Sequence, residues 1–402
     1  MTVIKTTVPG AGNKRVSGTH LLACLLVFFP RAGLDAQTDL NSQIRAAQAS
    51  GQYAKAADLY QQLIASGVDT PEIRTNWGIM LHLSGKHRES LDQFRRALRL
   101  NPNLPPANLF AGMAEVELHE YQAALPFLKK AANLNQRDTA PLLALAKAYL
   151  GLRDYRAAHD SYAGVASLDP NLAEAWYGAG VTNRAQADLV LNRAARSGKA
   201  NDPAVQAEAR RLLDDALSAL DRAMTLDPKS PRTHLIKAEA LSDAGRFSEA
   251  IGEYQATLEI DPNETAARVG LATGYWREHL FADALPLLRQ VLEQSPKDPE
   301  ANGMLADILA HDGKWDAARE RAELALAGNP DLIQTHVVLA RVWLGKKRPA
   351  QAIAELLKVA AADPDGSYHF LLFRAYREAG DEKNADVALA EFRRLHGFTT
   401  QP

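Results

Sequence analysis

This chain of 402 residues has a single cysteine, no large excess of either charge and no long apolar runs. The single Cys, Cys24, excludes a disulfide-stabilised scaffold, which needs several. The 46 Lys and Arg residues nearly balance the 48 Asp and Glu residues and leave a net charge of −2, so the clustered basic surface of a nucleic-acid-binding protein is not expected. The composition also excludes a bundle of membrane spans.

Catalytic motifs are missing as well. No glycine-rich loop ends in Gly-Lys-Ser/Thr, no His-Glu-x-x-His occurs, and no Gly-x-Ser-x-Gly follows a strand pattern. Gly85-Lys86-His87 comes nearest, but it lacks the upstream Gly and the hydroxyl residue. The His residues are scattered rather than paired at metal-ligand spacing. The sequence therefore predicts a protein that is not an enzyme and has no metal and no cofactor.

The amino-terminal segment has the pattern of a secretory signal. Lys5, Lys14 and Arg15 precede the apolar run of residues 21–29, and Ala36 offers a small residue for cleavage. At about 1.5 Å rise per residue, nine residues cover roughly 14 Å, about half of the hydrocarbon thickness. We therefore expect residues 1–36 to be a signal peptide and the protein to be exported, periplasmic or secreted.

Two minor alternatives for the amino terminus remain open. Residues 21–24, Leu-Leu-Ala-Cys, faintly resemble a bacterial lipoprotein box, and an uncleaved segment would anchor the chain in a membrane. Cleavage after Ala36 would remove the only Cys, four basic residues and one acidic residue, which moves the net charge to −5.

What the sequence does have is a period of 34 residues. Pro occurs at 228, 262, 296, 330 and 364, and each of these Pro residues follows Asp, Ser or Asn. Pro lacks an amide donor and disfavours a helical conformation in the residue before it. The spacing therefore indicates an array of helices with regular interruptions.

Small and large residues recur within the same period. Small residues allow two helices to approach closely, and large residues fill the volume between them. One small position is held by Gly78, Gly112, Ala146, Gly180, Ala238, Ala272, Ala306 and Ala340, and an aromatic position is held by Tyr121, Tyr155, Phe247, Phe281 and Trp315.

These residues carry a family resemblance. Residues 265–298 show the whole pattern, with Leu271, Ala272, Tyr275, Phe281, Ala284 and Pro296. The unit resembles the tetratricopeptide repeat, and similar units cover nearly all of residues 37–399. The resemblance implies an all-α fold, an α-solenoid in which helix-turn-helix repeats stack into a right-handed superhelix.

The chain divides into about ten such units. The first is degenerate, the last is expected to cap the array, and the fifth is longer than the others by 24 residues. The boundaries are 37–70, 71–104, 105–138, 139–172, 173–230, 231–264, 265–298, 299–332, 333–365 and 366–399.

The long fifth unit predicts a projecting hairpin around residues 187–207. Asp202 and Pro203 are suited to start a helix after a loop, so we expect both helices of this unit to be extended by about 12 residues, or roughly 18 Å. The hairpin carries Arg193, Arg196 and Lys199. It is either a tolerated insertion with a solvated basic face or an element that docks a partner.

The resemblance also implies a binding surface. In tetratricopeptide arrays the first helices line a concave groove that receives a peptide or helix of a partner. The corresponding residues here are Leu109, Met113, Leu143, Lys147, Tyr177, Val181, Arg184, Leu235, Glu239, Asp243, Val269, Thr273, Trp276, Arg277, Asp307, Val337 and Arg341.

Trp276 is the most informative member of this set. It falls one residue beyond the core position of Tyr275, so it either faces the groove as a binding anchor or packs on the adjacent unit. Family members that hold an acidic carboxyl-terminal tail use a Lys at a position where this chain has Leu109, Leu143 and Tyr177, so an adaptor of that type is not expected.

The predicted function is a non-enzymatic scaffold that binds protein partners, with no nucleic acid and with membrane contact only through the signal or by association. Self-association is a further option. The alternative is an accessory subunit of envelope polysaccharide or glycan synthesis or export, because similar arrays are joined to such machinery.

Overall fold

The computed structural model describes residues 36–199 and 202–396. These residues form twenty α-helices and no strand, which confirms the predicted all-α fold. The expected signal peptide lies outside the described residues except for Ala36, the first residue of α1. Among the described helices, none combines the length and the apolar character needed to cross a membrane.

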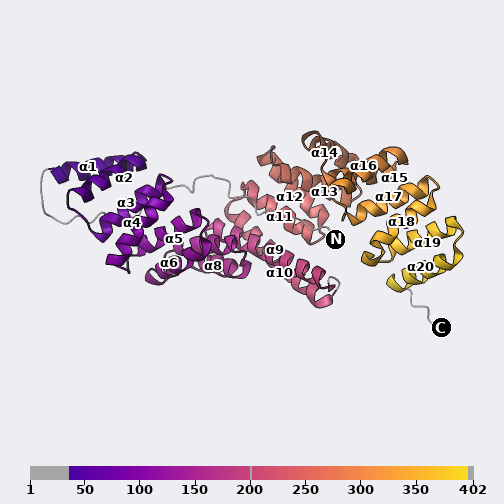
Figure 1. Ribbon diagram of the computed structural model, residues 1–402, viewed down its shortest axis with the longest axis horizontal. Helices are drawn as coiled ribbons and strands as arrows, with labels where there is room; N and C mark the ends of the chain where they lie inside the picture. The colour runs from indigo at the N-terminus through magenta and orange to yellow at the C-terminus, as the bar shows by residue number, and fades with distance from the viewer. Residues whose placement is uncertain (1–35, 200–201, 397–402) are drawn as a thin grey trace. The chain divides into compact units, whose positions relative to one another are not determined.

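The helices belong to two compact units, here called the N-terminal unit (residues 36–228) and the C-terminal unit (residues 229–396) (Figure 1). The N-terminal unit contains α1 (Ala36–Ala49), α2 (Tyr53–Ala65), α3 (Pro71–Leu83), α4 (His87–Leu100), α5 (Pro105–Glu117), α6 (Tyr121–Leu134), α7 (Ala140–Gly151), α8 (Tyr155–Leu168), α9 (Ala173–Arg196) and α10 (Pro203–Leu226). The C-terminal unit contains α11 (Pro231–Asp243), α12 (Phe247–Ile260), α13 (Thr265–Arg277), α14 (Phe281–Gln294), α15 (Pro299–His311), α16 (Trp315–Gly328), α17 (Ile333–Gly345), α18 (Pro349–Val359), the 3₁₀ turn η2 (Ala360–Ala362), α19 (Ser367–Ala379) and α20 (Glu382–Leu395).

At four of the Asn-Pro and Asp-Pro steps, the side chain of the residue before Pro supports the turn that ends the helix. Asn101, Asp169, Asp261 and Asn329 each accept, through Oδ1, a hydrogen bond of 3.0–3.2 Å from the amide two residues ahead. This Asx turn redirects the chain, and the Pro prevents the helix from continuing. The same local chemistry therefore ends the helix pair of one repeat and leads to the next.

The turn inside each helix pair requires a left-handed residue. In several repeats this position is held by glycine, as at Gly85, Gly245 and Gly313. In four others it is held by a residue with a side chain and a φ of 56–61°, namely His119, Arg153, His279 and Lys347. Side chains in this region are strained. Four repeats thus tolerate some backbone strain in order to keep the turn that sets the angle between their two helices.

Close helix crossings explain the recurrent small residues. A Cβ added to Gly112 would lie 2.4 Å from Leu128 Cγ, and one added to Gly180 would lie 2.5 Å from Leu220 Cγ. The Ala residues at the corresponding positions, including Ala272 and Ala306, are fully buried. The crossings at Gly112 and Gly180 therefore have no space for a methyl group, whereas those at the Ala residues hold one and little more, so these positions select Gly or Ala.

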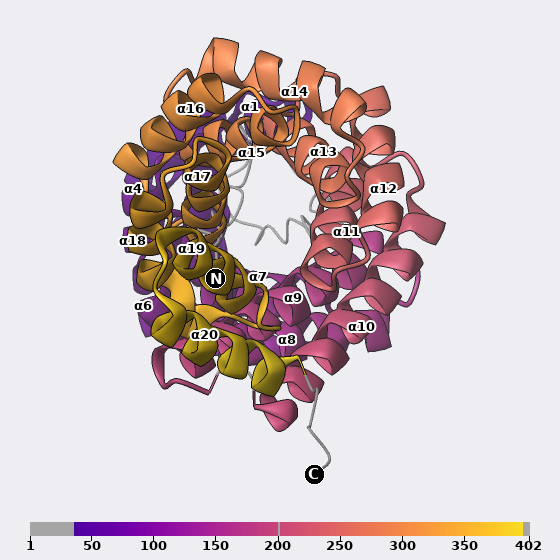
Figure 2. The ribbon, with the colours of Figure 1, turned by 90° about the vertical axis from the view of Figure 1, so that its right-hand side faces the viewer.

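Each repeat consists of a first and a second helix, and the first helices of neighbouring repeats contact one another. In the N-terminal unit α3 contacts α5 and α5 contacts α7; in the C-terminal unit the same holds from α11 through α13, α15 and α17 to α19. Pairs of second helices show no comparable contact among the described residues. Helices that lie closer together occupy the inner side of a curve, and Figure 2 shows α11, α13, α15 and α17 on the inner side of the C-terminal unit. We call this side of each unit its first-helix face.

The fifth pair is longer than the others. Helices α9 and α10 have 24 residues each and pack along each other, with Ala187, Ala194 and Ala209 buried between them. Arg193, Arg196 and other basic side chains of this hairpin are exposed.

Candidate functional site

The predicted binding residues lie on first helices of both units. In the N-terminal unit they lie on α5, α7 and α9, and in the C-terminal unit on α11, α13, α15 and α17. The two units therefore present two first-helix faces.

The face of the N-terminal unit is mainly apolar and serves packing between neighbouring repeats of that unit. Leu109 is only 7% exposed, and Met113 and Leu143 are half-buried against neighbouring core clusters. Tyr177, Val181 and Arg184 are also half-buried. Lys147 on α7 is exposed, so this face offers partly accessible apolar side chains beside one projecting cation.

The face of the C-terminal unit contains a polar connection between three first helices. Trp276 on α13 donates from Nε1 to Oδ2 of Asp307 on α15, at 2.8 Å. Arg341 on α17 forms an ion pair with the other carboxylate oxygen of Asp307. Asp307 thereby fixes both side chains, although 31 and 34 residues separate it from them in sequence.

Trp276 also packs on the adjacent repeat. Its half-buried ring lies against the apolar cluster that includes Met304 and Ile308 of α15. The ring therefore packs on the adjacent repeat while part of it stays accessible, so both interpretations of this residue remain compatible with its position. Leu235 on α11 is only 8% exposed, whereas Glu239 is half-buried.

Arg277 follows Trp276 and is exposed. Its guanidinium carbon lies 4.8 Å from the ring centroid of Trp276 and 5.7 Å from that of Phe247. Partial burial lowers the pKa of the guanidinium, and the electrostatic influence of Tyr368 opposes that shift. An Arg side chain remains protonated even so, so a fixed positive charge lies over the Trp276 ring.

Tyr368 and Gln334 extend this polar region and were missed by sequence reasoning. Gln334 Nε2 on α17 donates to the hydroxyl of Tyr368 on α19, at 2.9 Å. Burial raises the pKa of Tyr368, so its hydroxyl is neutral near pH 7. The repeat pattern gave no signal for this contact, because the repeat of residues 333–365 is one residue short and the two side chains occupy different repeat positions.

Two His–Glu pairs lie between first and second helices. His234 Nδ1 lies 2.6 Å from Glu253 and His336 Nδ1 lies 2.7 Å from Glu355. The second pair repeats the first at corresponding positions, three repeats later. No group of three metal-ligating side chains occurs in residues 36–199 and 202–396, so we interpret these pairs as cross-links within the helix pairs.

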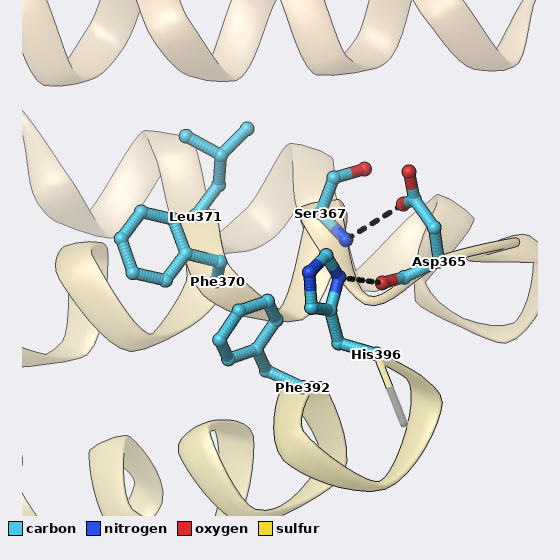
Figure 3. A pocket seen from close by; sticks show the side chains of 6 residues that line it. All are labelled: Asp365, Ser367, Phe370, Leu371, Phe392 and His396. Atoms are coloured by element: carbon cyan, nitrogen blue, oxygen red, sulfur yellow. Dashed lines mark hydrogen bonds between the residues drawn. The ribbon is translucent and has the colours of Figure 1, made fainter. Parts of the chain in front are cut away.

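A shallow pocket of about 330 Å³ lies at the last helix pair. Figure 3 shows the rings of Phe370 and Phe392 side by side, with His396 close to Phe392. Nδ1 of His396 donates a hydrogen bond to the carbonyl oxygen of Asp365, at 3.1 Å. At the position of Phe392, earlier repeats have the small buried residues Val291, Ala325 and Val359. The aromatic rings thus partly cover the end of the described stack.

Comparison with protein families gives two matching family models, both described as tetratricopeptide repeat. One matches residues 207–273, 275–332 and 311–372, and the other matches residues 41–105 and 143–203. Together they span most of both units.

Individual relatives match only in part. A cytochrome c-type biogenesis protein, CycH, of Rhizobium meliloti is 38% identical over 89 residues, which are 21% of this chain and 23% of that protein. A DnaJ homolog subfamily C member 7 homolog of Dictyostelium discoideum is 21% identical over 231 residues, 56% of this chain and 35% of that protein. The chain thus spans about a third or less of these relatives.

Among solved structures, a tetratricopeptide repeat protein of Parabacteroides merdae is similar over 65% of this chain and 94% of its own, with 15% identity and a TM-score of 0.46. Yeast Tom70 is similar over 89% of this chain and 91% of its own, with 15% identity and a TM-score of 0.38.

Proposed function

Because the chain belongs to the tetratricopeptide repeat family, we propose that it is a non-enzymatic scaffold that holds a peptide or helix of a partner protein on its first-helix faces. The observation that carries this proposal is the connection from Trp276 through Asp307 to Arg341. It holds three successive first helices in register and leaves an aromatic ring partly accessible on them. A rigid aromatic side chain beside charged groups is a common anchor for a bound segment.

Site-specific photocross-linking tests which side of the protein binds. A photoreactive phenylalanine analogue would replace Lys147 on α7 or Arg277 on α13, both exposed on first helices. The matched controls replace Lys130 on α6 and Arg289 on α14, which are exposed on second helices. We expect partner adducts from the first-helix positions in the native host, and adducts from the second-helix positions alone would contradict the proposal.

We also propose that residues 1–36 direct export, so that the scaffold works in the cell envelope or outside the cell. A reporter enzyme active only after export, fused behind residue 60, should lose activity when residues 1–36 are deleted. Cell fractionation of the untagged protein separates a released chain from a lipidated or anchored one. Reporter activity that persists without residues 1–36 would contradict export by this segment.

One relative supports an assembly role. The similarity to a protein named for cytochrome c-type biogenesis agrees with a scaffold that brings partners together during assembly. No observation on the described residues favours the alternative of envelope polysaccharide or glycan handling. Identification of the cross-linked partners by mass spectrometry would distinguish the two.

A further inference from the structure

The first-helix face of the C-terminal unit carries a cation that has no acidic partner there. Arg277 forms no ion pair and donates no side-chain hydrogen bond to any of the described residues; its recorded contacts are the rings of Trp276 and Phe247. Arg341 on the same face is paired with Asp307. Arg277 therefore differs from its neighbour in having its charge available.

The ring beneath Arg277 is fixed in place. Rotation of the Trp276 side chain is restricted because its Nε1 donates a hydrogen bond to Asp307, and Asp307 is itself held by an ion pair with Arg341. A guanidinium stacked on an aromatic face is attracted to the ring and keeps the N–H groups at its edge free to donate. Stacking also limits the rotamers of Arg277, so less side-chain entropy is lost when an acceptor arrives.

The free donors define the chemistry of the acceptor. A planar guanidinium with its edge open matches a carboxylate, which can accept two parallel hydrogen bonds. Trp276 beside it offers apolar surface to a neighbouring group of the same ligand. Partial burial, which also lowers the pKa of Arg277, reduces the solvent screening of its charge and so strengthens the attraction to an anion.

The face also continues beyond Arg277 in both directions. Helix α11 precedes α13, and α15 and α17 follow it, with contacts from each helix to the next. A bound chain is therefore able to pass Arg277 rather than end there, which favours an acidic side chain within a segment over a terminal carboxylate.

We propose that Arg277, stacked on Trp276, recognises the side-chain carboxylate of an Asp or Glu within a peptide segment of the partner, next to an apolar residue that contacts the Trp276 ring. This inference rests on the proposed function and adds the chemistry of the bound segment. A terminal carboxylate is the competing occupant.

The test uses random 12-residue peptides displayed with their carboxyl termini fused, so that only internal carboxylates are available. The full chain, wild type or Arg277→Met, is the target. Arg348→Met is the matched control, because Arg348 is also exposed and lies 5.8 Å from the ring centroid of Trp343, yet it was not predicted to face the groove. We expect Asp and Glu beside apolar residues to be enriched on wild type and Arg348→Met and not on Arg277→Met.

Matched synthetic peptides then give the magnitude. For a peptide selected on wild type, a Glu-to-Gln change should weaken binding about tenfold, as expected for loss of a charge-assisted contact, and should have little effect on binding to Arg277→Met. Equal acid enrichment on wild type and Arg277→Met would overturn the inference and leave the proposed function standing. So would acid-dependent binding only to peptides with free carboxyl termini, which would identify a terminal carboxylate as the occupant. Failure of the wild type to select any peptide would contradict the proposed function as well.

Discussion

At the scale of single residues, the space available at each helical glycine decides whether a larger side chain is tolerated there. Gly112 and Gly252 are both helical glycines, but they lie in opposite surroundings. A Cβ on Gly112 would overlap the Leu128 side chain and lie 3.3 Å from the Ala124 carbonyl oxygen, whereas a Cβ on Gly252 would meet nothing within 4 Å. Helix propensity alone would favour Ala at both positions.

Gly112→Ala should therefore destabilise the protein by about 1–3 kcal/mol, because overlap in a packed crossing outweighs the gain in helix propensity. Gly252→Ala, the control, should stabilise it by about 0.5–1 kcal/mol. Urea unfolding followed by circular dichroism measures both changes. A stabilising Gly112→Ala would show that the crossing has space to spare.

A second residue-scale effect concerns His82, which is 8% exposed and lies with its Nδ1 3.3 Å from Nδ1 of His87. Burial, and then the charge of His87, lower the pKa of His82 from 6.5 to about 4. The unfolded chain binds a proton near pH 6.5 that the folded chain does not accept until about pH 4. This contribution to stability is complete above pH 6.5 and is lost as the pH falls through that window.

Urea unfolding of the wild type should show a loss of up to about 3 kcal/mol between pH 6.5 and pH 4 from this residue. His82→Gln, which cannot titrate, should show a smaller dependence on pH over the same range. Identical pH profiles for the two proteins would refute the assignment.

At the scale of helices and their connections, the sequence predicted what local chemistry decides. Asn or Asp before Pro marks helix ends because the side chain and the ring act within a few residues, and the small positions follow from one crossing geometry repeated along the chain. The all-α fold was predictable for that reason. The bond from Trp276 to Asp307 was not, since it joins different helices and depends on side-chain rotamers.

The last helix pair shows how one substitution changes the role of an element. Phe392 on α20 stands where earlier repeats have a small buried residue, and its ring centroid lies 5.3 Å from that of Phe370 and 5.1 Å from that of His396. These contacts supply part of the cover that a following repeat provides elsewhere in the stack.

Phe392→Ala should therefore destabilise α19 and α20 by about 2 kcal/mol, through lost apolar contact. Val387→Ala is the control, because Val387 lies on the same helix and is 64% exposed. Hydrogen exchange of residues 367–395 should become faster in the first variant and not in the second. Equal exchange in both variants would show that Phe392 does not protect the pair.

At the scale of the whole molecule, we expect the N-terminal unit and the C-terminal unit each to have its own free energy of unfolding. Each helix pair contacts mainly its neighbours along the chain, and the residues group into two compact units. The cluster around Tyr60 and Phe94 belongs to the N-terminal unit, and the cluster around Leu356 and Leu372 belongs to the C-terminal unit. Repeat arrays of this kind spread a local change through nearest-neighbour contacts only.

Gly112→Ala, placed in α5, provides the test of this division. Hydrogen exchange should become faster in α3 to α7, where the disturbed crossing and its neighbours lie, by an amount that corresponds to the measured loss of about 1–3 kcal/mol. Exchange in α13 to α20 should not change, because those helices draw their protection from a separate core. Phe392→Ala is the reciprocal control and should leave α3 to α7 unaffected. If either substitution speeds exchange throughout both units, the chain unfolds as one cooperative body, and the first-helix faces could not respond to partners independently.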